Sequence, residues 1–255
     1  MSADSLLSWA VQTGISITVL TGFILLIRQP FARRYGAGAA YALWVLPLIR
    51  LFMPPITLPF LPAPPISLVP SLPYAERVIP GGLPVQTVPL EAPLNIAALL
   101  IALWLGGAVL WLSVQCIQQK AFMNRIQKES EPLSGRAVWA AKRAADQLGF
   151  PRIPNIRRST GNDGPLVTGL FNPCIILPHE FEDNFTPEQQ HFALLHEMAH
   201  LKRRDLWAAF ASLLFRAANW PNPLMHYAAR KFRADQEAAC DAYVLELSNH
   251  EKIDR

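Results

Sequence analysis

Two long uncharged segments constrain this chain more than any other feature of its sequence. Residues 5–27 contain no charged side chain and end at Arg28, and residues 94–114 are uncharged as well. Each segment is about as long as the helix of ~20 apolar residues that crosses the hydrocarbon core of a bilayer. The sequence therefore predicts a membrane protein in which both segments are transmembrane helices.

A third hydrophobic segment, residues 36–53, is interrupted by Pro47 and Arg50. Arg50 lies near one end, where a long side chain can snorkel to the interface, so a span is still expected there. A cleaved signal peptide is the alternative for residues 5–27, but no basic region precedes them and no A-x-A cleavage site directly follows. We therefore expect three spans, over 5–27, 36–53 and 94–114.

The distribution of positive charge predicts the orientation of these spans. Basic residues follow the first span (Arg28, Arg33, Arg34) and the third (Lys120, Arg125, Lys128, Arg136). Residues 54–93 carry one arginine and two glutamates and hold 12 of the 23 prolines, a composition typical of an extended loop. The positive-inside rule then places the N-terminus and this loop outside, so that a membrane region, 1–115, precedes a cytosolic domain, 116–255. The expected location is a bacterial cytoplasmic membrane.

Composition excludes several other classes of protein. The chain is 51% hydrophobic and 16% charged, whereas disordered chains are poor in hydrophobic residues and soluble domains carry about 25% charged residues. The net charge of +4 is not gathered into a long basic run, so direct binding of nucleic acid is not expected. Cys116, Cys174 and Cys240 have no paired spacing, which excludes a disulfide framework and a four-cysteine zinc site. The oligomeric state is not predicted.

The cytosolic half shows the signals of an α+β domain. An amphipathic helix ends at Gly149, and short β-prone runs follow at 155–158, 166–168 and 174–177. The sequence TPEQQ at 186–190 then carries a capping box and a first-turn proline, which predict the start of another helix.

That helix contains HEMAH at residues 196–200. His196 and His200 are four residues apart, so both imidazoles project from one face, at a spacing that suits a single Zn²⁺. Glu197 lies beside the first histidine and can reach a water at the metal without ligating it, as a general base does. The motif on a capped helix predicts one zinc ion per chain, and incidental histidines on a surface or packed helix are the alternative.

A further ligand is expected downstream, because a catalytic zinc uses three protein ligands and one open position. In the predicted helix FRADQEAACDAYVLEL, Glu237 and Asp241 share one face, so Glu237 can ligate and Asp241 can hold a histidine N–H. Cys240 is either another ligand or a small core residue, and a solvated acidic face is the alternative for the two carboxylates. His226 or Tyr227 is a candidate to stabilise an oxyanion.

Residues 206–215 (LWAAFASLLF) extend about 15 Å as a helix, which is too short to span a bilayer. A crossing there would also place Glu237 on the opposite side of the membrane from His196. We expect a helix that is buried in the domain or half sunk at the membrane surface, followed by a turn at residues 220–223.

Together these motifs resemble those of the BlaR/MecR-type membrane zinc metallopeptidases, the family of β-lactam sensor-transducers. The resemblance rests on HEMAHLKRRD (196–205), NPL (222–224), RADQEAACDAYVL (233–245) and GPLVTGLFNPCIILP (164–178). It implies a multi-pass α-helical membrane protein with a cytosolic α+β, zincin-like peptidase domain. The site residues that it implies are His196, His200 and Glu237 as zinc ligands, Glu197 as catalytic base and Asp241 as a supporting acid. It also implies signal-triggered cleavage of a protein substrate, often a cytosolic transcriptional repressor.

β-Lactam sensors of this type carry a fourth span and an external penicillin-binding domain after the peptidase. The sequence ends at Arg255, before either, so β-lactam sensing is not carried over and the peptidase domain is expected to be C-terminally incomplete. We expect a zinc endopeptidase whose strand near residues 173–177 pairs with an extended substrate. Two alternatives stay open: a housekeeping membrane protease of the prenyl-protein or heat-shock type, and a non-catalytic transducer with a closed structural zinc site.

Overall fold

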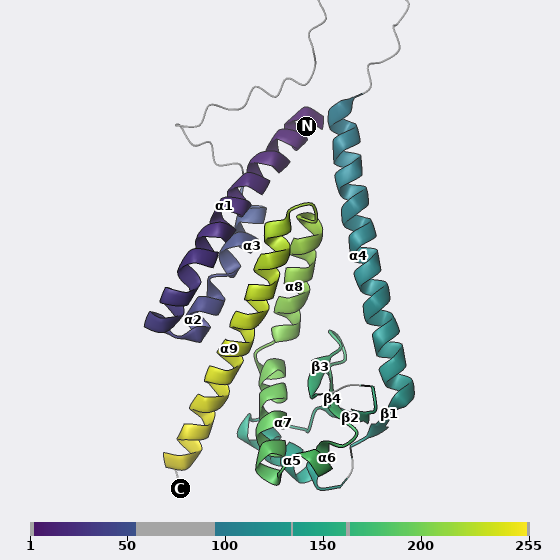
Figure 1. Cartoon of the computed structure of the whole chain (residues 1–255), viewed down its shortest axis with the longest axis vertical. Coiled ribbons are helices and arrows are strands. Elements are labelled where there is room, and N and C mark those ends of the chain that lie inside the picture. The colour runs from purple at the N-terminus through teal and green to yellow at the C-terminus, as the bar shows by residue number, and fades with distance from the viewer. Residues whose placement is uncertain (1–2, 55–94, 134, 162–163, 254–255) are drawn as a thin grey trace, which may run out of the picture.

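The computed structural model describes residues 3–54, 95–133, 135–161 and 164–253, and it is mostly helical with one small sheet (Figure 1). The helices of the N-terminal region are α1 (Ala3–Tyr35), α2 (Ala37–Ala42), α3 (Val45–Phe52) and α4 (Ile96–Glu129). Within the described ranges, α1 and residues 96–126 of α4 are the two helices long and apolar enough to cross a membrane. Except for Pro54, the predicted proline-rich loop lies outside the described residues.

Residues 36–53 form two short helices, α2 and α3, rather than the single helix that the sequence predicted. The break falls at Leu43 and Trp44, whose backbone N–H groups each bond to the carbonyl three residues earlier. Pro47 explains this position, because a proline ring clashes with the carbonyl four residues before it, here that of Leu43. Both short helices pack against α1.

The second half of the chain builds the small domain and a helical hairpin. Its helices are α5 (Ala137–Gln147), α6 (Phe181–Asn184), α7 (Pro187–Lys202), α8 (Asp205–Ala218) and α9 (Pro223–Ile253). Its strands are β1 (Ser130–Pro132), β2 (Asn155–Ser159), β3 (Leu166–Thr168) and β4 (Cys174–Pro178), so the three predicted strands are confirmed and β1 is additional. The capping box is also confirmed: the Thr186 hydroxyl accepts from the Gln189 N–H, and the Gln189 side chain accepts from the Thr186 N–H.

The sheet has the order β1-β2-β4-β3, with β2 and β4 parallel and the two outer pairs antiparallel. Ile175 and Leu177 on one face belong to the core formed with α5 and α7. Cys174 and Ile176 on the other face pack against Ile126 near the end of α4. Because β4 is paired on both sides, the prediction that residues 173–177 receive a substrate strand is wrong. The free edges of the sheet belong to β1 and β3.

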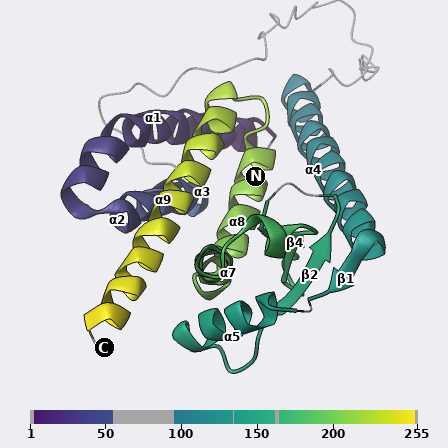
Figure 2. The ribbon, with the colours of Figure 1, turned by 60° about the horizontal axis from the view of Figure 1, so that its bottom comes forward.

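Helices α8 and α9 form an antiparallel hairpin between α1 and α4 (Figures 1 and 2). The connection covers residues 219–222, which confirms the turn predicted near residues 220–223. The hairpin returns the chain toward α7, so the 14-residue α8 does not separate α9 from α7. Helix α9 contacts α1 and α2 as well as α7.

A largely shielded ion pair joins α9 to α1. Arg28 on α1 pairs with Asp235 on α9, and the two side chains are 11% and 13% exposed. The indole N–H of Trp44, between α2 and α3, donates to the other oxygen of the Asp235 carboxylate at 2.8 Å. One carboxylate therefore connects three segments that are distant in the sequence.

We predict that Asp235→Ala lowers the melting temperature of the detergent-purified protein strongly, because it leaves the Arg28 guanidinium buried without a counter-charge. Removing one partner of a buried pair costs about 3–5 kcal/mol. Glu246→Ala, which removes an exposed acid from the same helix, is the control and should change stability little. Equal melting temperatures for the two variants would contradict a structural role for the pair.

Candidate metal centre

Helix α7 presents both histidines of the HEMAH motif on one face. The Nε2 atoms of His196 and His200 lie 3.1 Å apart, and their rings are nearly perpendicular. The side chains are 25% and 12% exposed, so the pair is partly shielded and still reachable. The helical spacing thus brings two nitrogen donors to one point, as the sequence predicted.

Helix α9 brings a carboxylate oxygen to the same point. Glu237 Oε2 lies 3.4 Å from His196 Nε2 and 3.3 Å from His200 Nε2. Ligand atoms placed 2.0–2.1 Å from a tetrahedral zinc are about 3.3 Å from one another. The three donor atoms therefore already have the mutual separations of a zinc ligand set, and the residues present fit the metal that the sequence implies.

Each histidine has a carboxylate on the ring nitrogen that faces away from these donors. Asp241 Oδ1 lies 3.2 Å from His196 Nδ1, and Asp205 Oδ2 lies 2.7 Å from His200 Nδ1. The Asp205 carboxylate accepts the Nδ1–H of His200, an arrangement usual for metal-binding histidines because it leaves Nε2 to ligate. Asp241 lies within ion-pair distance of His196 Nδ1. Asp241 was predicted for this role from the sequence, whereas Asp205 was not.

Asp205 reaches His200 because of the turn between α7 and α8. Arg204 has a left-handed backbone conformation, with φ of 61°, and Asp205 follows it as the first residue of α8. The Asp205 side chain is 4% exposed and also forms an ion pair with Arg203, with Nε at 3.2 Å from Oδ2. The buried Gln236 of α9 donates to the Asp205 backbone carbonyl at 3.1 Å. The sequence shows an acid five residues after His200, but only this turn directs it to the histidine.

The charges of the site favour a bound cation. Hydrogen bonding to Glu237 raises the pKa of His196, although burial opposes the shift. Burial also opposes protonation of His200, but hydrogen bonds led by that to Asp205 outweigh it and raise its pKa. The two histidines in turn lower the pKa of Glu237. The carboxylates therefore stabilise positive charge at the two rings, and a divalent cation that binds there has to displace the histidine protons.

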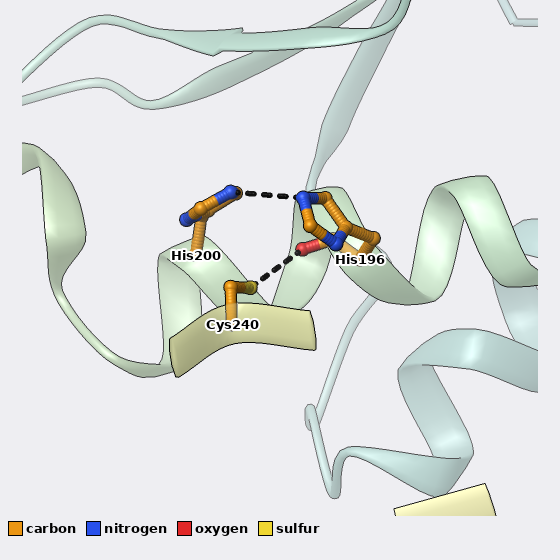
Figure 3. A group of neighbouring side chains, drawn as sticks. All are labelled: His196, His200 and Cys240. Carbon is orange, nitrogen blue, oxygen red and sulfur yellow. Dashed lines mark hydrogen bonds between the residues drawn. The ribbon is translucent and has the colours of Figure 1, made fainter. Parts of the chain in front are cut away.

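Cys240 lies beside the histidines and offers a sulfur atom as an alternative donor to the Glu237 oxygen. One potential ligand atom from each of His196, His200 and Cys240 can be chosen so that all three lie within 4.8 Å of one another. Figure 3 shows the thiol below the two rings, where Sγ donates to the backbone carbonyl of His196 at 3.6 Å. Cys240 is fully buried and belongs to the core shared by α7 and α9. Its position therefore suits a core residue, and Glu237 is the better-placed third donor.

Comparisons with known proteins agree with this geometry. The model of a protein family described as "BlaR1 peptidase M56" matches residues 8–254 of the chain. The chain belongs to the BlaR1 peptidase M56 family. It is 27% identical over 146 residues to "Regulatory protein BlaR1" of Bacillus licheniformis, covering 56% of this chain and 24% of that protein. It is 27% identical over 163 residues to "Methicillin resistance mecR1 protein" of Staphylococcus aureus (strain Mu50 / ATCC 700699), covering 62% and 27% of the two chains.

The aligned part spans about a quarter of the length of these M56 relatives. Family membership confirms the BlaR/MecR-type resemblance that the motifs indicated. It identifies a membrane protein of metallopeptidase type, in agreement with the two apolar helices and the donor set described above.

The structure does not bring His226 and Tyr227 to the donor set. Both lie in the first turns of α9, and His226 precedes Glu237 by eleven residues, about 16 Å along a helix. The His226 Nε2–H group donates to the Trp220 carbonyl at 2.9 Å, and its ring lies beside Trp111 of α4. The exposed Tyr227 ring lies against the ammonium group of Lys231. These contacts leave no role for either residue at the donor set in this structure.

We predict that Glu237→Ala weakens or abolishes zinc binding, because it removes the oxygen donor and leaves only two nitrogens. Zinc content is measured by mass spectrometry on detergent-purified protein, where the unchanged chain should hold one zinc ion. Cys240→Ala is the matched variant on the same helix and should retain the metal. Loss of zinc from Cys240→Ala together with full occupancy in Glu237→Ala would assign the third donor to the thiol.

We predict that Asp205→Asn raises the zinc dissociation constant about 10–100-fold, the usual effect of removing an outer partner of a metal-binding histidine. The substitution keeps the size of the side chain and removes the charge that fixes His200. Glu188→Gln, an exposed acid on α7, is the control in the same chelator-competition titration. An unchanged affinity in Asp205→Asn would contradict the orienting role.

Proposed function

We propose that the chain is a zinc metalloendopeptidase that hydrolyses peptide bonds of a protein substrate at the cytoplasmic face of a bacterial membrane. The observation that carries the proposal is the close set of His196, His200 and Glu237 donor atoms beside Glu197. A zinc ion held by these residues would supply Lewis-acid chemistry, which activates a water and polarises the scissile carbonyl. Catalysis would require Cys240 to stay in the core and not to act as a fourth ligand.

Glu197 acts as the general base and then as the acid. Burial raises the pKa of its carboxyl, although the nearby histidines oppose the shift. A carboxylate with a raised pKa is a better proton acceptor, because its pKa lies closer to the operating pH. Glu197 takes a proton from the attacking water and delivers it to the amine of the leaving peptide. Asp205 and Asp241 keep the histidine tautomers fixed throughout.

An extended substrate is proposed to pair with β3. This strand is at one edge of the sheet and contacts α7, the helix that carries the HEMAH motif. Among the described strands β3 pairs with β4 alone, so its other edge is available for main-chain hydrogen bonds to a peptide. Edge pairing gives affinity without selecting side chains, which suits an endopeptidase that acts within a folded or partly unfolded protein.

The membrane topology is proposed as follows. Helix α1, the α2–α3 segment and the apolar part of α4 form the membrane region, with the N-terminus outside and residues 116–255 cytoplasmic. Lys120, Arg125 and Lys128 on the last turns of α4 are then on the cytoplasmic side. These turns pack on the sheet, so α4 links the membrane region directly to the peptidase domain.

The names of the relatives support a proposal for the substrate class. Their names describe a regulatory protein and a methicillin-resistance protein. We propose that this chain performs regulated proteolysis within a signalling pathway, with a cytosolic repressor as the substrate. A β-lactam is not proposed as the signal.

A non-catalytic transducer is the second candidate, and the proximity of Cys240 to both histidines favours it. With Glu237 and Cys240 both bound, the zinc has four protein ligands, which is typical of a closed structural site. X-ray absorption at the zinc edge distinguishes the two candidates: sulfur in the coordination sphere favours the transducer, and nitrogen and oxygen only favour the peptidase.

We predict that Glu197→Gln retains one zinc per chain and lowers peptide cleavage by about 10²–10⁴-fold, the usual contribution of a general base. Cleavage of a peptide library by the protein in proteoliposomes is followed by mass spectrometry. The unchanged chain treated with 1,10-phenanthroline provides the metal-free control, and Glu188→Gln provides the matched acid control. Retained cleavage in Glu197→Gln would remove Glu197 from the mechanism.

A further inference from the structure

The tip of the α8–α9 hairpin contacts the middle of both long apolar helices. The Asn222 side-chain amide donates to the Thr18 hydroxyl of α1 at 2.8 Å. On the other side, the indole N–H of Trp220 donates to the Trp104 carbonyl, and the indole N–H of Trp104 donates to the Ala218 carbonyl, both at 3.0 Å. Thr18 lies near the centre of the uncharged segment 5–27, and Trp104 lies near the centre of 94–114. The contacts to α1 and to α4 therefore both place the tip near the middle of the two predicted membrane spans.

The exposed face of α8 is entirely apolar. Its exposed residues within the described helix are Trp207, Ala209, Phe210 and Leu214. A helix with this surface in water normally carries polar or charged residues at such positions. Trp207 also meets the exposed ring of Phe171, from the turn between β3 and β4, at 5.8 Å between centroids.

The polar groups of the tip bond within the protein. The Asn219 amide donates to the Phe215 carbonyl at 2.9 Å, and the Asn222 side chain accepts from the Leu224 N–H at 3.0 Å. The Asn219 carbonyl accepts the backbone N–H of Asn222. Backbone that is not helical is tolerated at membrane depth only when its polar groups are bonded in this way.

The charged residues of the hairpin give its lower border. Between the turn and Arg230, α9 carries no aspartate, glutamate, lysine or arginine, and its one histidine there, His226, bonds to the Trp220 carbonyl. Arg230, Lys231 and Arg233 lie within two helical turns of Asp235, so their long side chains can reach the polar border. Asp235 then pairs with Arg28, the residue that ends the uncharged part of α1. From Asp235 back to Pro223 the helix rises about 18 Å, slightly more than half of the ~30 Å hydrocarbon core. The depth of the tip calculated along α9 therefore agrees with its hydrogen bonds to residues near the middle of α1 and α4.

We propose that α8 and the first turns of α9 form a half-membrane hairpin, which enters the bilayer from the cytoplasmic side and contacts lipid acyl chains with the apolar face of α8. The proposal rests on the membrane topology proposed above. Residues 206–215 are too few to span, and such short apolar helices occur as re-entrant segments. The donor set then lies at the membrane border, beside the level of the Arg28–Asp235 pair.

After its first residue, Asp205, helix α8 carries one residue with a formal charge, Arg216. The structure places the Arg216 side chain away from the exposed apolar face of α8. Its guanidinium carbon lies 4.8 Å from the centre of the Trp111 ring of α4, a cation–π contact. A charged side chain at this depth is expected to face the interior of the protein. Gly107 of α4 makes room for the hairpin, because a Cβ there would overlap the Trp220 ring.

The test measures depth with single spin labels in proteoliposomes, in a chain with Cys116 replaced by serine. Labels at Trp207→Cys and Leu214→Cys lie on the same face of α8, seven residues and about 10 Å apart along the helix. Relative accessibility to oxygen and to a water-soluble nickel complex reports the depth of each label. We expect Leu214→Cys to lie deep in the bilayer and Trp207→Cys to lie about 10 Å shallower.

Two controls separate failure of the hairpin from failure of the topology. Val109→Cys on the exposed face of α4 should be buried in lipid, and Trp139→Cys on the exposed face of α5 should be in water. Equal depths at residues 207 and 214 mean a helix lying flat on the membrane and overturn the proposal. Water exposure at Leu214→Cys alone also overturns it, whereas water exposure at Val109→Cys overturns the spans and the hairpin together. Zinc content of each labelled variant confirms that it has folded.

Discussion

The return of α9 to the histidine-bearing face of α7 is the constraint on which the rest of the structure depends. Glu237 and the two histidines are donors to one point only if the chain between them reverses direction. The α8–α9 hairpin provides that reversal, and its turn is held by reciprocal hydrogen bonds between Trp104 of α4 and the tip. The Arg28–Asp235 pair then fixes α9 along its axis two residues before Glu237. The position of Glu237 is therefore set by the hairpin turn at the start of α9 and by the ion pair two residues before Glu237.

The environment of the donors follows from where these helices meet. Because α7 and α9 share a core that includes Cys240, the two histidines lie at the edge of a packed interface and are partly shielded, whereas the Glu237 side chain is 50% exposed. Partial burial strengthens the interactions between the histidines and their carboxylates, since the effective dielectric constant is lower than in water. The same burial raises the pKa of Glu197. One packing arrangement thus orients the histidine rings and tunes the proposed base.

The sequence was informative where chemistry depends on local spacing. The i,i+4 pairs His196/His200 and Glu237/Asp241 share helix faces in the structure, as their spacing predicted, and the capping box starts α7 at the expected residue. The sequence was less informative where the structure depends on contacts between distant residues or on an unusual backbone conformation. Pro47 divides residues 36–53 into two helices, and the partner strands of β4 cover both of its edges. Asp205 depends on the unusual backbone of Arg204, which no spacing rule indicates.

By itself, the sequence determined the apolar helices, the helix that carries the HEMAH motif and the pair of downstream acids, because each depends on the periodicity and composition of a short segment. Tertiary structure alone decided which acid faces which nitrogen, since Glu237 and Asp241 approach different sides of His196 only after α9 has packed on α7. It also decided the position of α8, whose length excludes a full span but does not distinguish a surface helix from a hairpin between α1 and α4. The physical reason is that hydrogen bonds such as Asn222 to Thr18 join residues about two hundred positions apart, and local pattern carries no information on such pairs.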